Sequence, residues 1–201
     1  MPISHNNKLI FIHVPKTGGS SIEKVLNLHP SHVNKSEEEV VLSGGKRQLQ
    51  HLTLSEIYNL KGEELFGFTI FGMVREPFSR MKSEYKWRKL SNHPIVDGLD
   101  LDGFVSKIYN RWIKKEHLDS HFTSQTDFFR NEVQFWADLR IFKFEDGFDK
   151  VAEFISQIVG EKIDFIPRTN QTKSFKEKIS FSENSRSMMC EMFKSDFELY
   201  K

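Results

Sequence analysis

The stretch FIHVPKTGGSSIEKVL, residues 11–26, contains the strongest structural signal in the chain. An apolar run rich in β-branched and aromatic residues predicts a buried strand over Lys8–Val14, and a helix is expected from about Ser20. The turn between them combines a proline, a lysine, a threonine, two glycines and two serines, although one of these devices is enough for a structural turn. Glycines let the backbone approach a ligand closely, and the polar side chains can donate to an anion. The stretch therefore predicts a loop that cradles a phosphate group.

The same pattern of strand, loop and helix occurs a second time. The residues FGFTIFGMVR predict a buried strand over Phe68–Val74, followed by Arg75 and by a helix that begins at Pro77. An arginine directly after a buried strand can bind a phosphate with two parallel hydrogen bonds. The remaining expected elements are a short strand over Val40–Leu42, a helix capped by Thr53 or Ser55, a helix over Leu101–Lys115, a third strand in LRIFKFED (residues 139–146), a helix over Phe148–Val159 and a last helix from Ser182.

Strands that alternate with helices favour an α/β fold, here a three-layer sandwich with a mainly parallel central sheet. In such sheets ligands bind outside the carboxyl ends of the strands, which is where both loops fall. At 201 residues the chain is long enough for one sizeable core and short for two. We therefore expect a single domain over residues 1–201.

Composition limits the partners of the protein. The 29 Lys and Arg residues balance 28 Asp and Glu residues, which argues against a general binder of nucleic acid or of membrane surfaces. Cys190 is the only cysteine, so no intrachain disulfide and no cysteine-based metal cluster can form. The first eight residues lack the apolar core of a signal peptide, and no stretch is apolar enough to span a membrane. A reducing cytoplasm is the expected compartment.

The order of residues in the first loop argues against one interpretation of it. A P-loop that binds a nucleoside triphosphate places its lysine and its Ser or Thr after the last glycine. Here Lys16 precedes Gly18 and Gly19, and the second strand runs into Arg75 instead of an acidic residue that could hold a metal ion. The sequence therefore argues against an enzyme that hydrolyses ATP or GTP. A small-molecule kinase and a catalytically inactive nucleotide-binding module remain open alternatives.

FIHVPKTGGSSI together with FGMVREPFSRMKSEY resembles the sulfotransferase family, in particular the branch of carbohydrate sulfotransferases and many bacterial relatives. The resemblance implies a P-loop-like, nucleotide-kinase-like fold. It also implies the sulfuryl donor PAPS (3′-phosphoadenosine 5′-phosphosulfate), the product PAP and no requirement for a metal. On this resemblance the second loop binds the 3′-phosphate through Arg75 and Ser79. The first loop binds the 5′ end through Lys16, Thr17, Gly18, Gly19, Ser20 and Ser21.

Weaker resemblances extend over most of the chain. QHLTLSEI is similar to the segment that carries the family's catalytic histidine, which assigns the general base to His51. SHFTSQTDFF is similar to a His-x-x-x-Gln segment, which implies that His121 and Gln125 contact the acceptor. IPRTNQTKS is similar to a late turn that implies a donor contact from Lys173. The expected reaction is in-line transfer of a sulfuryl group to a hydroxyl of a saccharide or small molecule, with Lys16 stabilising the leaving phosphate.

Several other side chains carry expectations. His13, inside the first strand, is expected to be a packed histidine or one that supports the loop, and Arg80 is expected on a helix surface. Cys190 is expected in the core because it lies in a methionine-rich helix. Three tryptophans could stack on adenine, although most such aromatic residues belong to a core: Trp87, Trp112 and Trp136.

Overall fold

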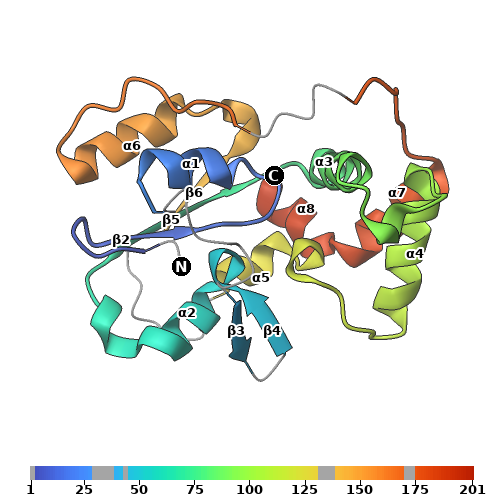
Figure 1. Ribbon diagram of the computed structural model, residues 1–201, viewed down its shortest axis with the longest axis horizontal. Coiled ribbons are helices and arrows are strands. Elements are labelled where there is room, and N and C mark those ends of the chain that lie inside the picture. Colours follow the sequence, from blue (N-terminus) through green and yellow to red (C-terminus); the bar gives the residue numbers. More distant parts are fainter. Residues whose placement is uncertain (1–2, 29–38, 43–44, 131–138, 170–174) are drawn as a thin grey trace.

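The protein is described by a computed structural model that covers residues 3–28, 39–42, 45–130, 139–169 and 175–201. Its central sheet has four strands in the order β1-β2-β5-β6 (Figure 1). β1 (Ile3–Ser4) is antiparallel to β2 (Leu9–Ile12), and β2, β5 (Thr69–Val74) and β6 (Leu139–Lys143) are parallel. The predicted mixed α/β fold with a mainly parallel sheet is therefore confirmed. β1 was not predicted, because two residues carry no readable periodicity.

Helices cover both faces of the sheet (Figure 1). α1 (Gly19–Val25) and α6 (Asp149–Val159) lie on one face, and α2 (Leu54–Lys61) and α5 (Gln125–Phe129) lie on the other. The strands supply both cores, because successive side chains of a strand point to opposite faces. Leu9, Phe11, Phe71 and Met73 pack with α1 and α6, whereas Ile10, Ile12, Ile70 and Val74 pack with α2 and α5.

A second group of helices lies beside the sheet (Figure 1). It consists of α3 (Pro77–Leu90), α4 (Leu101–Ile113), α7 (Glu183–Met192) and α8 (Lys194–Tyr200). Tyr85, Phe104 and Met189 are completely or almost completely buried in a core of their own between α3, α4 and α7. Where the sequence predicted one last helix, the structure has two, α7 and α8, which meet at Phe193. The break lets Phe193 join this core while Asp196 accepts hydrogen bonds from the backbone N–H groups of Gln125 and Thr126, at the start of α5.

Short elements complete the chain. β3 (Glu39–Leu42) contains the predicted strand and pairs with β4 (Gly45–Gln48) in a separate hairpin. Thr53, not Ser55, caps α2, because its hydroxyl accepts from the backbone of Glu56 while the Glu56 carboxylate accepts from the backbone of Thr53. No helix in the described part of the chain combines the length and apolar character that a membrane crossing requires. The 3₁₀ helices are η2 (Leu49–His51), η3 (Gly62–Leu65), η4 (Pro94–Val96), η5 (Ser120–Phe122) and η6 (Phe144–Asp146).

Candidate active site

The loop between β2 and α1 is held in an unusual shape by close packing. Lys16 has φ 69° and Gly18 has φ 88°, both in the left-handed region. A Cβ on Gly18 would lie 2.8 Å from the Phe148 ring, and one on Gly19 would lie 2.1 Å from the His13 ring, so neither position has room for a side chain. Thr17 is completely buried, and its hydroxyl donates to the carbonyl of Val14. Thr17 therefore shapes the loop and does not line the pocket beside it.

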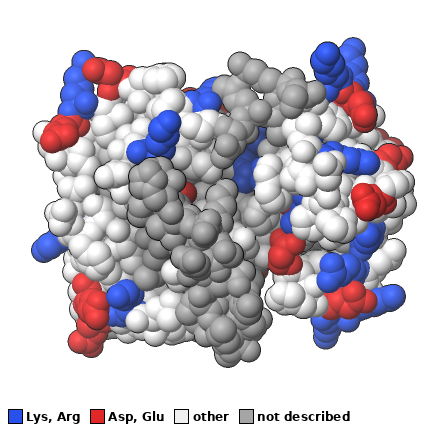
Figure 2. All heavy atoms as spheres, viewed as in Figure 1, with Lys and Arg blue, Asp and Glu red and all other residues white. Residues whose placement is uncertain are grey.

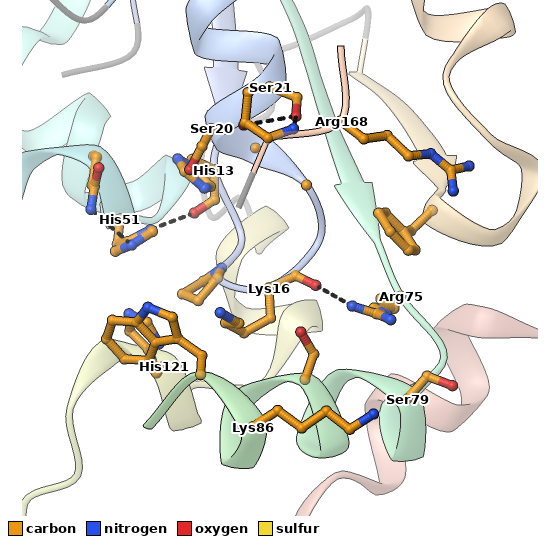
Figure 3. A pocket seen from close by; sticks show the side chains of 18 of the residues that line it. His13, Lys16, Ser20, Ser21, His51, Arg75, Ser79, Lys86, His121 and Arg168 are labelled. Atoms are coloured by element: carbon orange, nitrogen blue, oxygen red, sulfur yellow. Dashed lines mark hydrogen bonds between the residues drawn. The ribbon is translucent and has the colours of Figure 1, made fainter. Parts of the chain in front are cut away.

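A pocket of about 630 Å³ opens next to this loop, at the carboxyl ends of β2 and β5. It lies between α1 and α3, as the side chains in Figure 3 show, and Figure 2 shows lysine or arginine atoms in the hollow near the centre of the face. No Asp or Glu is among the described residues that line it, so its electrostatic character is cationic. Its described lining includes five lysine and arginine side chains: Lys16, Arg75, Lys82, Lys86 and Arg168.

Lys16 lies in the middle of the pocket (Figure 3). Its Nζ is 4.8 Å from the centre of the Trp87 ring, a distance suited to a cation–π contact. Burial lowers the pKa of Lys16 from 10.5 to about 8; Glu84 opposes this shift, whereas Arg75 and Arg88 add to it. The ammonium group is therefore charged at neutral pH but is poorly solvated, which makes it receptive to an anion.

Arg75 is fixed at one end of the pocket. Gln125 clamps its backbone, because the Gln125 amide accepts from the N–H of Arg75 and donates to its carbonyl, both at 2.8 Å. The guanidinium stacks 4.3 Å from the Phe144 ring and donates from Nη1 to the carbonyl of Lys16. Its Nε is buried and has no hydrogen-bond partner among the described residues, and an oxygen of the Glu145 carboxylate is 3.9 Å away. Burial lowers the pKa of Arg75, with Glu145 and Glu76 opposing, and the buried Nε–H is a donor that a bound anion could use.

Three histidines gather at the other end of the pocket (Figure 3). His13 is buried, and its Nδ1 donates to Glu23 at 2.8 Å, as expected for a packed histidine that supports the loop. The ring of His51 is 4.6 Å from that of His13 and 5.2 Å from that of His121. All three rings line the pocket. The pocket therefore has an arginine end and a histidine end, with Lys16 between them.

The hydrogen bonds of His51 define its tautomer. Nδ1 lies 2.9 Å from the carbonyl oxygen of His13, which can only accept, so Nδ1 carries the proton. Nε2 keeps the lone pair, and the Gln50 amide donates to it at 3.1 Å. Burial lowers the pKa of His51 well below 6.5, and the nearby His13 and His121 lower it further. His51 is therefore neutral at physiological pH.

His121 has a different partner. Its Nδ1 lies 2.8 Å from Oε2 of Glu84 on α3, and the Trp87 ring stacks on its face with the ring centres 5.2 Å apart. Burial alone would raise the pKa of Glu84, but the charge and hydrogen bond of His121, together with Arg88 and Lys16, lower it to about 2. Glu84 is therefore ionised throughout the physiological range.

The structure places most of the predicted site residues on one pocket. Lys16, Gly18, Gly19, Ser20, Ser21, Arg75, Ser79, His51 and His121 all line it. Ser21 faces another segment, because its hydroxyl lies 3.1 Å from that of Thr169 and accepts from the Thr169 backbone. Lys173 lies outside the described residues, as does Trp136.

Other expectations need correction. Gln125 was expected to contact an acceptor, but it is completely buried, does not line the pocket and orients Arg75 instead. Arg80 is not a surface residue: its guanidinium donates to the carbonyls of Pro15, His121 and Thr123, which ties the first loop to η5. Cys190 is exposed, because the neighbouring Met189 occupies the inward side of α7.

Sequence reasoning also missed several residues of the pocket. Ser83 and Lys86 follow Ser79 at the four- and seven-residue spacing of one helix face, so the periodicity of α3 contained a signal for them. Arg168, Phe144 and Phe148 come from distant segments and carried no such signal. Of the tryptophans, Trp87 lines the pocket, whereas Trp112 is half exposed and stacks on Tyr109.

The fold and the pocket together define a mixed α/β protein with a cationic binding site at the carboxyl ends of its parallel strands. The chain matches the sulfotransferase family over residues 1–201 and belongs to that family. Its general activity is therefore sulfuryl transfer, which makes it a transferase. No curated protein and no solved structure matches the chain significantly.

Proposed function

We propose that the protein transfers a sulfuryl group from PAPS to a hydroxyl of a saccharide or small-molecule acceptor and releases PAP. The observation that carries this proposal is the cationic pocket, which brings the loop after β2 and the arginine after β5 to one ligand site. A single domain over residues 1–201, with a P-loop-like phosphate cradle, is the corresponding architecture. Family membership supports the reaction type, and the pocket supports a polyanionic donor.

The residues present fit such a donor. PAPS carries phosphate or sulfate charge at both ends of its ribose, and the pocket offers cations with no opposing carboxylate in its described lining. Within the part of the chain that the structure describes, the buried Nε of Arg75 has no hydrogen-bond partner, and a phosphate oxygen would supply one. Gly18 and Gly19 have the Phe148 and His13 rings directly beside them, and this close packing holds the loop in its shape next to the pocket.

The proposed roles follow the two ends of the pocket. At the arginine end, Arg75, Ser79 and Ser83 would hold the 3′-phosphate. In the middle, Lys16 and the hydroxyl of Ser20 would hold the 5′-phosphosulfate, and Lys16 would neutralise the charge that develops on the leaving phosphate. This is the electrostatic task that Mg²⁺ performs in kinases, so activity in the presence of a chelator is expected.

The acceptor hydroxyl would lie at the histidine end, where its proton can be taken during attack. His51 is the base that the sequence predicts, and the tautomer above leaves its Nε2 as the basic atom. A positioned base of this kind contributes about 10² to 10⁴ in rate. Attack from the histidine end, with the leaving phosphate near Lys16, is compatible with in-line displacement.

Replacement of Arg75 tests the donor site. We expect Arg75→Ala to bind PAP about 10- to 100-fold more weakly than the wild type, because a charged hydrogen bond to the phosphate is lost. Titration calorimetry with PAP measures this. Arg140→Ala, which removes an exposed arginine of β6, is the matched control and should bind normally.

Two outcomes of the same titrations would contradict the proposed function. Binding of ATP with Mg²⁺ but not of PAP would favour a small-molecule kinase. Tight binding of PAP without any release of PAP from PAPS, over a broad panel of saccharides and small alcohols, would favour an inactive nucleotide-binding module.

The lowered pKa of Lys16 predicts a pH dependence of donor binding. The charged ammonium binds the anion, and it loses its proton as the pH rises through about 8. PAP affinity should therefore be nearly constant near pH 7 and fall by up to about tenfold per pH unit well above pH 8. Titrations from about pH 7.5 to about pH 9.5 check this, since the second pKa of a phosphate monoester is about 6 and both phosphates of PAP are almost fully ionised there. Lys16→Met should bind weakly and without this alkaline decline; an unchanged decline in that variant would contradict the assignment.

A further inference from the structure

Glu84 and His121 form an ordered pair at the histidine end of the pocket. The side chain of Glu84 is 2% exposed, whereas that of His121 is 14% exposed and lines the pocket. Because a carboxylate can only accept, the 2.8 Å contact places a proton on Nδ1 of His121, so that in the neutral ring the lone pair is on Nε2. No described residue is hydrogen-bonded to Nε2. The Trp87 ring on its face further restricts the orientation of the imidazole.

The hydrogen-bond partners of Glu84 favour its charged form. Arg88, itself 2% exposed, donates from Nε to the other carboxylate oxygen of Glu84. Arg88 is in turn held by two hydrogen bonds from Nη2 to Asp119, at 3.0 and 2.9 Å. The arrangement places a permanent negative charge against Nδ1 of His121, and an imidazolium formed there has its counter-ion already in contact.

His51 lacks these features. Its Nε2 already accepts from the Gln50 amide, and its Nδ1 donates to a neutral carbonyl. Neither partner carries a negative charge. A proton gained by His51 would therefore create a buried cation between His13 and His121, which burial strongly disfavours.

We propose that His121, oriented by Glu84, is the group that removes the proton of the attacking hydroxyl. This inference rests on the proposed function and assigns the base to His121 in place of His51. The acceptor oxygen forms a bond to sulfur while the bond from sulfur to the 5′-phosphate oxygen breaks, and the electron pair of that bond leaves with PAP. The hydroxyl proton moves to Nε2 of His121 and is later released to water. His51, with its ring centre 5.2 Å from that of His121, positions the hydroxyl.

A purely structural role for the Glu84–His121 pair would give a different result. The test must therefore measure the protonation of the His121 ring directly. Glu84→Gln keeps the shape of the side chain but has only one oxygen. If this oxygen faces Arg88, the amide N–H₂ faces His121 and forces the proton from Nδ1 to Nε2, the wrong tautomer for a base. Glu116→Gln is the matched control, because it removes an exposed carboxylate five residues before His121 that pairs with Arg111 and lies outside the Glu84 network.

The first measurement is ¹⁵N NMR of the histidine rings in the full chain at pH 7.5, without ligand. We expect His121 to be protonated at Nδ1 in the wild type and in Glu116→Gln, and at Nε2 in Glu84→Gln. Protonation at Nε2 in the wild type would overturn the inference whatever the activity of the protein.

The second measurement is PAP release from PAPS with the best acceptor of the saccharide and alcohol panel. His121→Ala and Glu84→Gln should each lower kcat by at least about 100-fold with PAP affinity unchanged. Added imidazole should partly restore His121→Ala, and Glu116→Gln should remain within about threefold of the wild type. If Glu84→Gln retains measurable turnover, the acid limb of its pH–rate profile should lie at lower pH than that of the wild type. The reason is that the protonated His121 ring has lost its counter-ion. The described charged and titratable groups around this ring are Glu84 and Arg88 of α3, Arg80, Lys16, His51, His93 and Asp119.

The outcomes separate the two proposals. Turnover by His121→Ala within about threefold of the wild type would overturn the role of His121 and leave the sulfotransferase proposal intact. A wild type that neither binds PAP nor uses PAPS would contradict the proposed function, while the NMR result would still decide the tautomer.

Discussion

Lys16→Ala is expected to lower kcat for sulfuryl transfer by about 10² to 10³, the cost of removing one preorganised group that stabilises transition-state charge. The physical reason is the position of the ammonium group. It lies between the arginine and histidine ends of the pocket, is poorly solvated and has its pKa lowered to about 8. Because the group would stabilise the leaving phosphate more than the bound donor, the loss in kcat should exceed the loss in PAP affinity. Steady-state kinetics and calorimetry together separate the two quantities.

The control for Lys16→Ala is Lys24→Ala. Lys24 is an exposed lysine in the last turn of the helix that follows the loop, so it tests the effect of removing a nearby positive charge from the surface. We expect its kinetics and PAP affinity to match those of the wild type. Equal losses in both variants would indicate a general electrostatic effect and would contradict a specific role for Lys16.

Gly19→Ala is expected to destabilise the protein by about 3 kcal/mol, at the upper end of the range for overpacking. The added Cβ would lie 2.1 Å from Cδ2 and 2.3 Å from Nε2 of the His13 ring. That ring cannot easily move, because it is hydrogen-bonded to Glu23 and packs against His51. For a chain of this size the melting temperature should fall by about 6–12 °C. Any folded fraction should turn over slowly, since a displaced His13 also moves the carbonyl that orients His51.

Two variants make this prediction specific. Ser20→Ala, at the next position, adds no atoms and should melt within about 2 °C of the wild type, because surface substitutions have small effects. The double variant Gly19→Ala with His13→Ala removes the clash, so its loss of stability should be smaller than the sum of the two single losses. Thermal unfolding followed by circular dichroism measures all four proteins. An additive double variant would show that Gly19 is not constrained by the His13 ring.

The sequence predicted those features of the site that depend on a strand and the residues directly after it. The two buried strands that contain Phe11 and Phe71 can be predicted from the sequence. A run of apolar, β-branched residues is typical of a strand that is covered on both faces of a sheet. Once two such strands are parallel neighbours, the residues after them must meet at one edge. The amino-acid pattern alone therefore places the loop of Lys16 and the position of Arg75 together, and both line the same pocket.

The tertiary structure decided which partner each polar side chain has. Helical periodicity shows that Arg80 and Glu84 share a face of α3, but it does not show what packs against that face. Arg80 is buried because η5 and the first loop cover it. Gln125 orients Arg75 from 50 residues away, and Glu84 holds His121 from 37 residues away. Such pairs depend on how distant segments come together, which local pattern does not encode. The sequence alone thus determined where the anion site forms, and only the packing of η5 against α3 decided that His121, and not His51, is paired with the carboxylate of Glu84.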